Sequence, residues 1–297
     1  MYLTGFTDEA AAGIDGQIRA VKELGWKYIE SRNIDGVNIH DLSEQEFDIV
    51  YGKLQDADIR INCFGSAIGN WAKRIDEPFD SSLEEAQRAI PRMQRLGTKM
   101  IRIMSFAVLP NREPEDQMEQ ERFKRVRELQ KMFTDAGILV VHENCANYGG
   151  MGPLFTLRLL ENVPGLKLVF DTGNTVGKPD FGKPKPYTMQ SSWEFYSLVK
   201  EHVAYVHIKD GYWDEENGET VMTFPGEGNG DVRRIVKDLI LNGYDGGFSI
   251  EPHIAVVAHD PSVQSEDDVR YATYVEYGRR MEQLIGEKET DHAAACL

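Results

Sequence analysis

The sequence predicts an α/β protein that folds as a single (β/α)8 barrel, a ring of parallel strands enclosed by helices. Two observations lead to this fold class. Short apolar segments of β character alternate with longer segments of helical periodicity along the whole chain, which is typical of a parallel sheet built from βα units. The alternation repeats eight times in 297 residues, whereas an open doubly wound sheet more often has about five to seven strands.

Eight segments are predicted to form the strands of this barrel. In chain order they are residues 2–6, 27–30, 60–64, 100–104, 139–142, 166–170, 204–208 and 247–251. Each is an apolar run short enough to be a buried strand and is followed by polar or turn-forming residues. The C-terminal ends of these segments should meet at one mouth of the barrel.

Eight helices are predicted between and after these strands. They lie near residues 13–25, 43–56, 82–96, 117–136, 152–162, 191–201, 231–242 and 266–286. Four of these segments end at or just before a glycine, and helices commonly end with a glycine in the left-handed conformation. These glycines are Gly25, Gly97, Gly137 and Gly243. We expect the barrel to occupy residues 1–286 and a frayed tail to occupy residues 287–297.

Charge and cysteine content exclude several classes of protein. The chain carries 33 Lys and Arg against 49 Asp and Glu, a net charge of −16, and such a charge repels nucleic acid and anionic membrane surfaces. We therefore expect neither as a partner. Cys63, Cys145 and Cys296 are too few and scattered for a disulfide framework. The N-terminus lacks the basic and apolar regions of a signal peptide, so a cytoplasmic location is expected.

Four polar residues stand at the C-terminal ends of the last four predicted strands. They are Glu143, Asp171, His207 and Glu251, and each follows three or four residues of strand character. Residues at this end of a barrel strand point toward the shared mouth, so the four side chains should lie close together. A single Asp or Glu there is more often a helix cap or an ion-pair partner, but four in register are poorly explained by separate structural roles.

These residue types together predict a divalent metal site. Three carboxylates in one place repel one another unless a cation neutralises them, and an imidazole completes a set of three oxygens and one nitrogen. Such ligation suits Mn²⁺, Mg²⁺ or Co²⁺ more than a structural Zn²⁺, although Zn²⁺ is also possible. The predicted ligands are Glu143, Asp171, His207 and Glu251.

Motifs along nearly the whole chain resemble those of the xylose isomerase-like barrels, also described as the sugar phosphate isomerase/epimerase family. The matching pieces are Asp8-Glu9, His142-Glu-Asn144, Phe170-Asp-Thr-Gly-Asn174, Val206-His-Ile-Lys-Asp210, Pro225-Gly-Glu-Gly228 and the segment 243–251. In that family the positions matched by the four predicted ligands bind a divalent metal, often manganese. The resemblance also implies a homo-oligomer, a dimer or a tetramer.

The ketose 3-epimerases of the family indicate a reaction. They use two metal-bound glutamates as an acid/base pair on opposite faces of a chelated ketose, and Glu143 and Glu251 match those positions. The chelating metal stabilises the enediolate that forms when a carboxylate accepts the proton. This chain departs from the epimerase pattern at Gly149, Asn174 and Trp213, where those enzymes have glutamate, histidine and arginine.

A second set of residues is predicted to assist. Lys209 shares a strand face with His207 and is a candidate catalytic residue for a developing oxyanion, with an ordinary ion pair as the alternative. For other residues a structural role competes with substrate binding. Strand alternation favours a His142 that packs in the interior, and Glu227 could equally be a turn residue. Trp71 and Trp213 could stack on a sugar ring or simply pack within the protein. The candidate substrate-binding residues are His142, Asn174, Trp213, Glu227 and His253.

The sequence therefore predicts a divalent-metal-dependent isomerase or epimerase acting on a sugar or keto-inositol through an enediolate. A lyase or dehydratase acting on a keto-inositol or a 3-oxo-glycoside is the alternative, because the same enediolate can expel a β-substituent. An apurinic-site endonuclease fits less well, since it would need further histidines and the chain has only seven. A non-catalytic sugar-binding barrel would usually have lost a ligand, and all four are present.

Overall fold

Eight parallel strands form the central sheet of the computed structural model, which describes residues 1–257, 260 and 262–295. Their order around the sheet is β1-β12-β9-β8-β7-β6-β5-β2, and all neighbouring pairs are parallel. A parallel bridge between Phe6 and Glu30 brings the two ends of the sheet together and nearly closes the barrel. The strands are β1 (Tyr2–Gly5), β2 (Tyr28–Ser31), β5 (Arg60–Gly65), β6 (Met100–Ile103), β7 (Leu139–Glu143), β8 (Lys167–Asp171), β9 (Val203–Ile208) and β12 (Gly247–Ile250).

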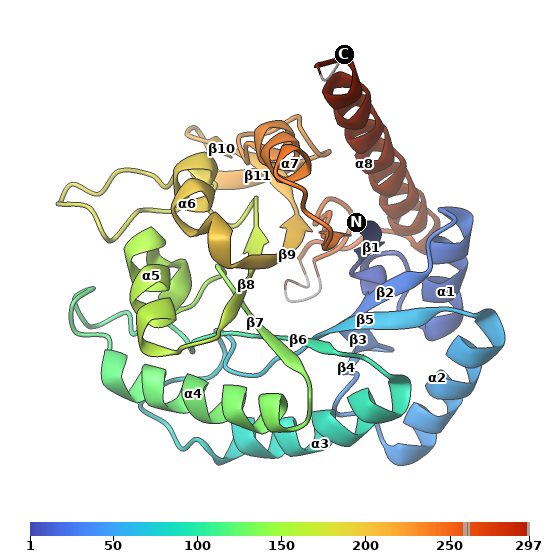
Figure 1. The fold of residues 1–297 in the computed structure, drawn as a ribbon, viewed down its shortest axis with the longest axis horizontal. Helices are drawn as coiled ribbons and strands as arrows, with labels where there is room; N and C mark the ends of the chain where they lie inside the picture. The colour runs from blue at the N-terminus through green and yellow to red at the C-terminus, as the bar shows by residue number, and fades with distance from the viewer. Residues whose placement is uncertain (258–259, 261, 296–297) are drawn as a thin grey trace.

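The helices follow one another around the strands in chain order, as Figure 1 shows. They are α1 (Ile14–Glu23), α2 (Glu44–Ala57), α3 (Asp80–Leu96), α4 (Glu119–Asp135), α5 (Pro153–Asn162), α6 (Ser192–Val199), α7 (Val232–Leu241) and α8 (Asp267–Ala295). The predicted (β/α)8 barrel is confirmed. The main hydrophobic cluster lies between strands and helices, with Ile29, Ile101 and Phe170 packing against residues such as Val21, Leu129 and Phe195.

Local sequence signals set several helix ends. Ser43 and Glu46 form a reciprocal capping box at the start of α2, which satisfies two backbone N–H groups that lack a partner within the helix. Gly97 ends α3 with a positive φ of 73°, as its position in the sequence predicted. Helix α8 continues past Gly286 to Ala295, within the segment 287–297 that was expected to form a frayed tail; residues 296–297 lie outside the described residues.

Smaller elements stand between the barrel strands and were not predicted. Short 3-10 helices cover Thr7–Glu9 (η1), Tyr148–Met151 (η2) and Lys200–His202 (η3), and β3 (Asn33–Ile34) pairs with β4 (Val37–Asn38). The larger addition is an antiparallel hairpin after β9, formed by β10 (Asp210–Asp214) and β11 (Glu219–Thr223). This hairpin lies where no helix or strand was predicted, and its residues Thr220 and Met222 line a cavity at the C-terminal mouth of the barrel.

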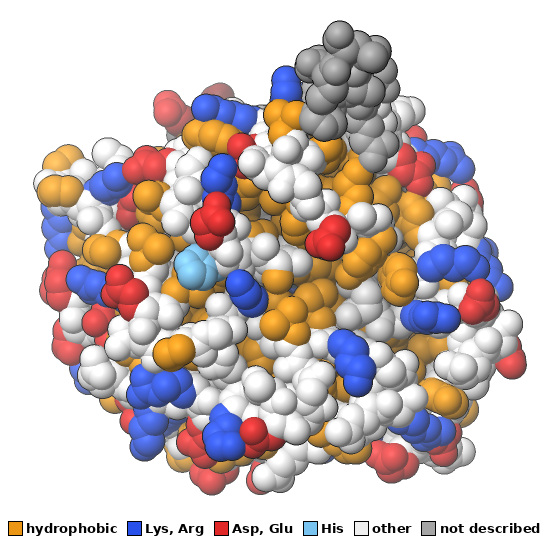
Figure 2. All heavy atoms as spheres, viewed as in Figure 1, with side chains coloured by type: hydrophobic (Ala, Val, Ile, Leu, Met, Phe, Trp, Pro, Cys, Tyr) orange, Lys and Arg blue, Asp and Glu red, His pale blue; other side chains and the backbone are white. Residues whose placement is uncertain are grey.

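Charged side chains of both signs are interspersed around the margin of the face shown in Figure 2, while hydrophobic side chains gather nearer its centre. A shallow hollow at the N-terminal ends of β1 and β2 is lined by apolar residues that include Tyr2, Trp26 and Phe248. Among the described residues, no helix has the combined length and apolar character that spanning a membrane requires.

Candidate metal centre

Four side chains from neighbouring strands converge at the C-terminal end of the barrel. Glu143 ends β7, Asp171 ends β8, His207 lies on β9, and Glu251 follows β12 directly. Asp171 and His207 are direct partners in the β8–β9 register. Inward-facing side chains from neighbouring strands of a barrel meet, and here each of the four residues is at most 3% exposed. The atoms that could act as ligands all lie within 4.8 Å of one another.

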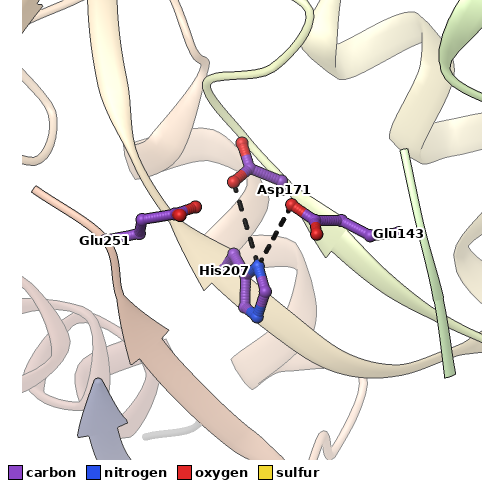
Figure 3. A group of neighbouring side chains, drawn as sticks. All are labelled: Glu143, Asp171, His207 and Glu251. Carbon is purple, nitrogen blue, oxygen red and sulfur yellow. Dashed lines mark ion pairs between the residues drawn. The ribbon is translucent and has the colours of Figure 1, made fainter. Parts of the chain in front are cut away.

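Figure 3 shows Glu143 and Glu251 entering this cluster from opposite sides, with Asp171 and His207 between them. The Nδ1 atom of His207 lies 3.4 Å from Oε1 of Glu143 and 3.9 Å from Oδ2 of Asp171. The sequence thus placed these four residues in the same small volume, as their strand-end positions predicted.

Glu30, on β2, fixes the orientation of the His207 ring. Its carboxylate oxygens lie 3.0 and 3.2 Å from Nε2 of His207, and the same carboxylate accepts hydrogen bonds from the hydroxyls of Tyr205 and Ser249. With Nε2 held in this way, Nδ1 faces the cluster. Although it is buried, Nδ1 forms no hydrogen bond with any residue that the structure describes.

The cluster therefore fits a divalent cation. Three carboxylates and a ring nitrogen whose other side is held by a carboxylate form the donor set that metal-binding histidine sites commonly show. Nδ1 of His207 lies near two carboxylates but makes no hydrogen bond with a described residue, and it is the polar atom that such an ion would satisfy. This buried acidic and histidine cluster could hold a metal ion through Glu143, Asp171, His207 and Glu251.

The ammonium group of Lys209 lies between two of these carboxylates. Nζ is 3.0 Å from Oδ2 of Asp171 and 2.9 Å from Oε2 of Glu251, and the side chain is buried. Burial favours the neutral amine, but the surrounding carboxylates outweigh it and raise the pKa of Lys209 above its ordinary value. Lys209 is therefore a cation, and its ammonium group lies in the same cluster as the His207 ring.

Each glutamate of the cluster also pairs with a buried arginine. Nη1 of Arg102 lies 2.9 Å from Oε2 of Glu143, and Nη1 of Arg32 lies 2.8 Å from Oε1 of Glu251. Arg32 is held in turn by Asp8, which accepts hydrogen bonds of 2.9 and 3.1 Å from it. Sequence reasoning missed Arg102, although a charged residue in the middle of an apolar strand was the available signal.

These contacts shift the pKa values of the buried groups in different directions. Burial alone would raise the pKa of Glu143, but Arg102 and His207 outweigh it and lower the value to about 2. For Asp171, burial and the neighbouring Glu251 outweigh Lys209 and raise the pKa to about 7. Burial lowers the pKa of His207, yet Glu30 and Glu143 outweigh it and raise the value to about 10. In the metal-free protein the imidazole is therefore a cation at neutral pH.

A cavity of about 410 Å³ opens above the cluster. Glu143, Glu251 and Lys209 contribute to its lining, as do two of the predicted substrate-binding residues, Asn174 and His253. Asn174 donates a hydrogen bond of 3.0 Å from Nδ2 to Oε1 of Glu143. A substrate in this cavity would thus contact the cluster directly.

The other three predicted substrate-binding residues are not among the described residues that line the cavity. His142 is fully buried beside Ser105 and Asn147, and burial lowers its pKa to about 4. Trp213, on β10, packs over Gly177, and Glu227 forms an ion pair of 2.7 Å with Arg280 near the surface. The alternation of side chains along β7 explains why His142 does not reach the cavity: Glu143, the next residue, points inward, so His142 points outward.

A second group of possible ligands shares Glu251. Glu9, Glu251 and His253 also bring their ligating atoms within 4.8 Å of one another. His253 has a positive φ of 53°, its backbone N–H donates to Glu9, and its Nε2 lies 3.2 Å from Oε1 of Glu251. The first cluster offers four potential ligands and this one three, so the first cluster is the better metal site.

The fold and this cluster together define a class: a (β/α)8 barrel with a buried acidic and histidine site at its C-terminal mouth. The chain matches the xylose isomerase-like TIM barrel family over residues 18–273, and it belongs to that family. A comparison with curated protein sequences finds no match.

Solved structures share the fold at low sequence identity. A xylose isomerase-like barrel protein of Mycobacterium smegmatis, solved in complex with magnesium, is 18% identical over 97% of both chains, with a TM-score of 0.68. An L-ribulose 3-epimerase is 13% identical over 99% of this chain and 97% of its own, with a TM-score of 0.69. The probable 3-DHS dehydratase AsbF of Bacillus anthracis is 18% identical over 92% of this chain and 97% of its own, with a TM-score of 0.66.

Proposed function

We propose that this protein is a divalent-metal-dependent isomerase or epimerase that acts on a sugar or a keto-inositol. One observation carries the proposal: two glutamates face each other across a buried cluster that could hold a metal ion, at the floor of a cavity. The family membership and the epimerase folds among the solved structures support it. When bound, the ion, with Mn²⁺ preferred, would stabilise negative charge on an enediolate oxygen.

The chain's own residues would supply the remaining chemistry. Glu143 and Glu251 approach from opposite sides, so one carboxylate can accept the proton from the substrate carbon and the other can return a proton to the opposite face. Lys209 would place its positive charge beside the developing oxyanion. Arg32 and Arg102 hold the two glutamates in position through the oxygens that they contact.

Elimination is the second candidate reaction, because Gly149 and Asn174 depart from the pattern of the ketose 3-epimerases. A Cβ atom at Gly149 would lie 2.3 Å from Cε1 of His142, so the glutamate of the ketose 3-epimerases would require the His142 ring to move. Asn174 likewise stands where the ketose 3-epimerases have a histidine, and it donates a hydrogen bond to Glu143. A lyase or dehydratase would use the same enediolate but expel a β-hydroxyl or an alkoxide.

Metal analysis and solvent exchange test the proposal together. We expect the purified protein to bind about one Mn²⁺ per chain and Glu251→Gln to bind it at least about tenfold more weakly, since a ligand is lost. Deuterium from solvent should enter a ketose or keto-inositol only when the metal is present; loss of water would mark elimination. Glu215→Gln, on the exposed hairpin turn, is the control. Failure of the native protein to bind any divalent metal would refute the proposal.

A further inference from the structure

A third group of possible metal ligands lies apart from the cavity at the barrel mouth. His40 and Asp41 belong to the segment between β4 and α2, and Glu85 lies on α3. Each residue offers one ligating atom, and these atoms all lie within 4.8 Å of one another. None of the three is among the described residues that line the cavity above the first cluster. The proposed reaction therefore makes no use of this group.

Two buried atoms of this group make no hydrogen bond with a described residue. They are Nδ1 of His40 and Oε2 of Glu85. His40 is fully buried and Glu85 is 9% exposed. Nδ1 of His40 does lie 3.2 Å from Oδ1 of Asp41, but this close contact is not directed as a hydrogen bond. Buried polar atoms nearly always have a partner, and a single cation among these side chains would contact both atoms.

Basic side chains keep both carboxylates of the group ionised and in place. Nζ of Lys73 lies 2.8 Å from Oε1 of Glu85, which leaves Oε2 available. The guanidinium of Arg88 contacts Oδ1 of Asp41. A divalent cation requires ionised carboxylates, and held ligands lose less freedom when the ion binds. The first cluster has the same arrangement, since a basic residue contacts one oxygen of each of its glutamates.

The other nitrogen of the His40 ring faces the backbone of Ala67. The N–H group of Ala67 lies 3.4 Å from Nε2, which makes a long and weak hydrogen bond. In this arrangement Nε2 is the acceptor and Nδ1 carries the ring proton. A cation bound at Nδ1 moves that proton to Nε2 and breaks the weak bond to Ala67. In exchange the ion gains an imidazole and two carboxylates as ligands, which outweigh one long hydrogen bond.

We propose that His40, Asp41 and Glu85 form a separate, structural metal site that binds Zn²⁺. Imidazole is a ligand that Zn²⁺ favours over Mg²⁺, and three protein ligands with a water molecule complete a tetrahedral zinc site. The ion would join the segment before α2 to α3. Ala67 contacts the same group and belongs to the segment that carries Trp71 to the cavity, so the ion would also steady that segment. This inference does not depend on the proposed function.

Zinc stoichiometry separates this site from the first cluster, which can also accept Zn²⁺. The full chain is dialysed against Zn²⁺, the bound metal is counted by elemental analysis, and calorimetry gives the affinities. We expect about two Zn²⁺ ions per native chain and about one in Glu85→Gln, which keeps the first cluster. Asp41→Asn, at a partly exposed ligand, should weaken the same site at least about tenfold and carries the test where Glu85→Gln does not fold. Glu251→Gln should weaken only the other site.

Glu84→Gln is the matched control, because Glu84 is the exposed neighbour of Glu85 on α3 and lies outside the group. It should bind Zn²⁺ as the native protein does. Zinc content and affinity that are the same in the native protein, Glu85→Gln and Asp41→Asn overturn the inference. A single ion that Glu85→Gln loses and Glu251→Gln keeps would support this site and refute the first. A single ion with the opposite behaviour would overturn this site and leave the proposed function standing.

Discussion

At the scale of single residues, charge compensation organises the site. In each of the candidate ligands Glu143 and Glu251, one carboxylate oxygen contacts an arginine and the other faces the cluster. Buried ion pairs of this kind contribute little net stability, but removal of one partner leaves an uncompensated charge. Their value here is positional, because each arginine fixes the direction in which its glutamate presents the remaining oxygen.

Lys209 is expected to compete with the metal ion. Its ammonium contacts Asp171 and Glu251, so an ion that binds those carboxylates must displace it. Lys209→Met should therefore destabilise the metal-free protein, while Mn²⁺ should bind at least about tenfold more tightly than to the native protein. Calorimetric titration with Mn²⁺ alone and thermal unfolding with and without Mn²⁺ measure both effects.

Lys178→Met is the matched control for this substitution, since Lys178 also lines the cavity but is exposed. Its Mn²⁺ affinity should equal that of the native protein. Weaker Mn²⁺ binding by Lys209→Met would show that the lysine supports the metal site instead of competing for it.

At the scale of elements, a single carboxylate on β10 holds the glycine-rich loop 225–230 in place. The carboxylate of Asp210 accepts backbone hydrogen bonds of 2.8–3.0 Å from Gly226, Gly228 and Gly230, and one of 2.9 Å from Gly211. These are the donors with which such a loop could otherwise bind phosphate. A Cβ atom at Gly228 would lie 2.4 Å from the carbonyl oxygen of Gly211, so only glycine allows this approach.

Asp210→Asn should loosen this loop. The amide replaces an acceptor oxygen with a donor group that faces backbone N–H groups, which costs about 1–3 kcal/mol in the free energy of unfolding. Urea denaturation measures the loss, and hydrogen exchange should show faster exchange at residues 226–230. Glu215→Gln, on the neighbouring exposed turn, is expected to behave like the native protein. Unchanged exchange at Gly226, Gly228 and Gly230 in Asp210→Asn would contradict this account.

At the scale of the whole molecule, buried histidines link stability to pH. Burial lowers the pKa of His142 and of His253 to about 4. The unfolded chain takes up these protons near pH 6.5, whereas the folded protein does not until about pH 4. Their contribution is therefore complete above pH 6.5 and is lost as the pH falls from 6.5 to 4.

For His142 this loss amounts to roughly 3 kcal/mol. His142→Gln should flatten the fall in stability between pH 6.5 and 4, whatever its effect at pH 7. Urea denaturation of the metal-free protein across this range measures the slope. His202→Gln, which removes a histidine outside the buried site, should keep the native slope. A His142→Gln slope as steep as the native one would mean that another group governs the acid response.

Much of the fold could be predicted because it depends on local pattern. Apolar runs alternating with helical periodicity identified the eight barrel strands and eight helices, and their ends differ from the structure mostly by one or two residues. The hairpin of β10 and β11 was missed, since its strands are short and largely polar and pair with each other instead of joining the barrel sheet. The extent of α8 was also underestimated, as no proline follows Gly286 to end it.

The sequence by itself determined the barrel and the convergence of Glu143, Asp171, His207 and Glu251, because strand ends in a barrel meet by geometry alone. Only the tertiary structure decided which residues surround them. Glu30 and Arg102 reach the site from strands distant in sequence, and the lining of the cavity is assembled from separate loops. Contacts of this kind depend on side-chain direction and loop path in three dimensions, which no local periodicity encodes.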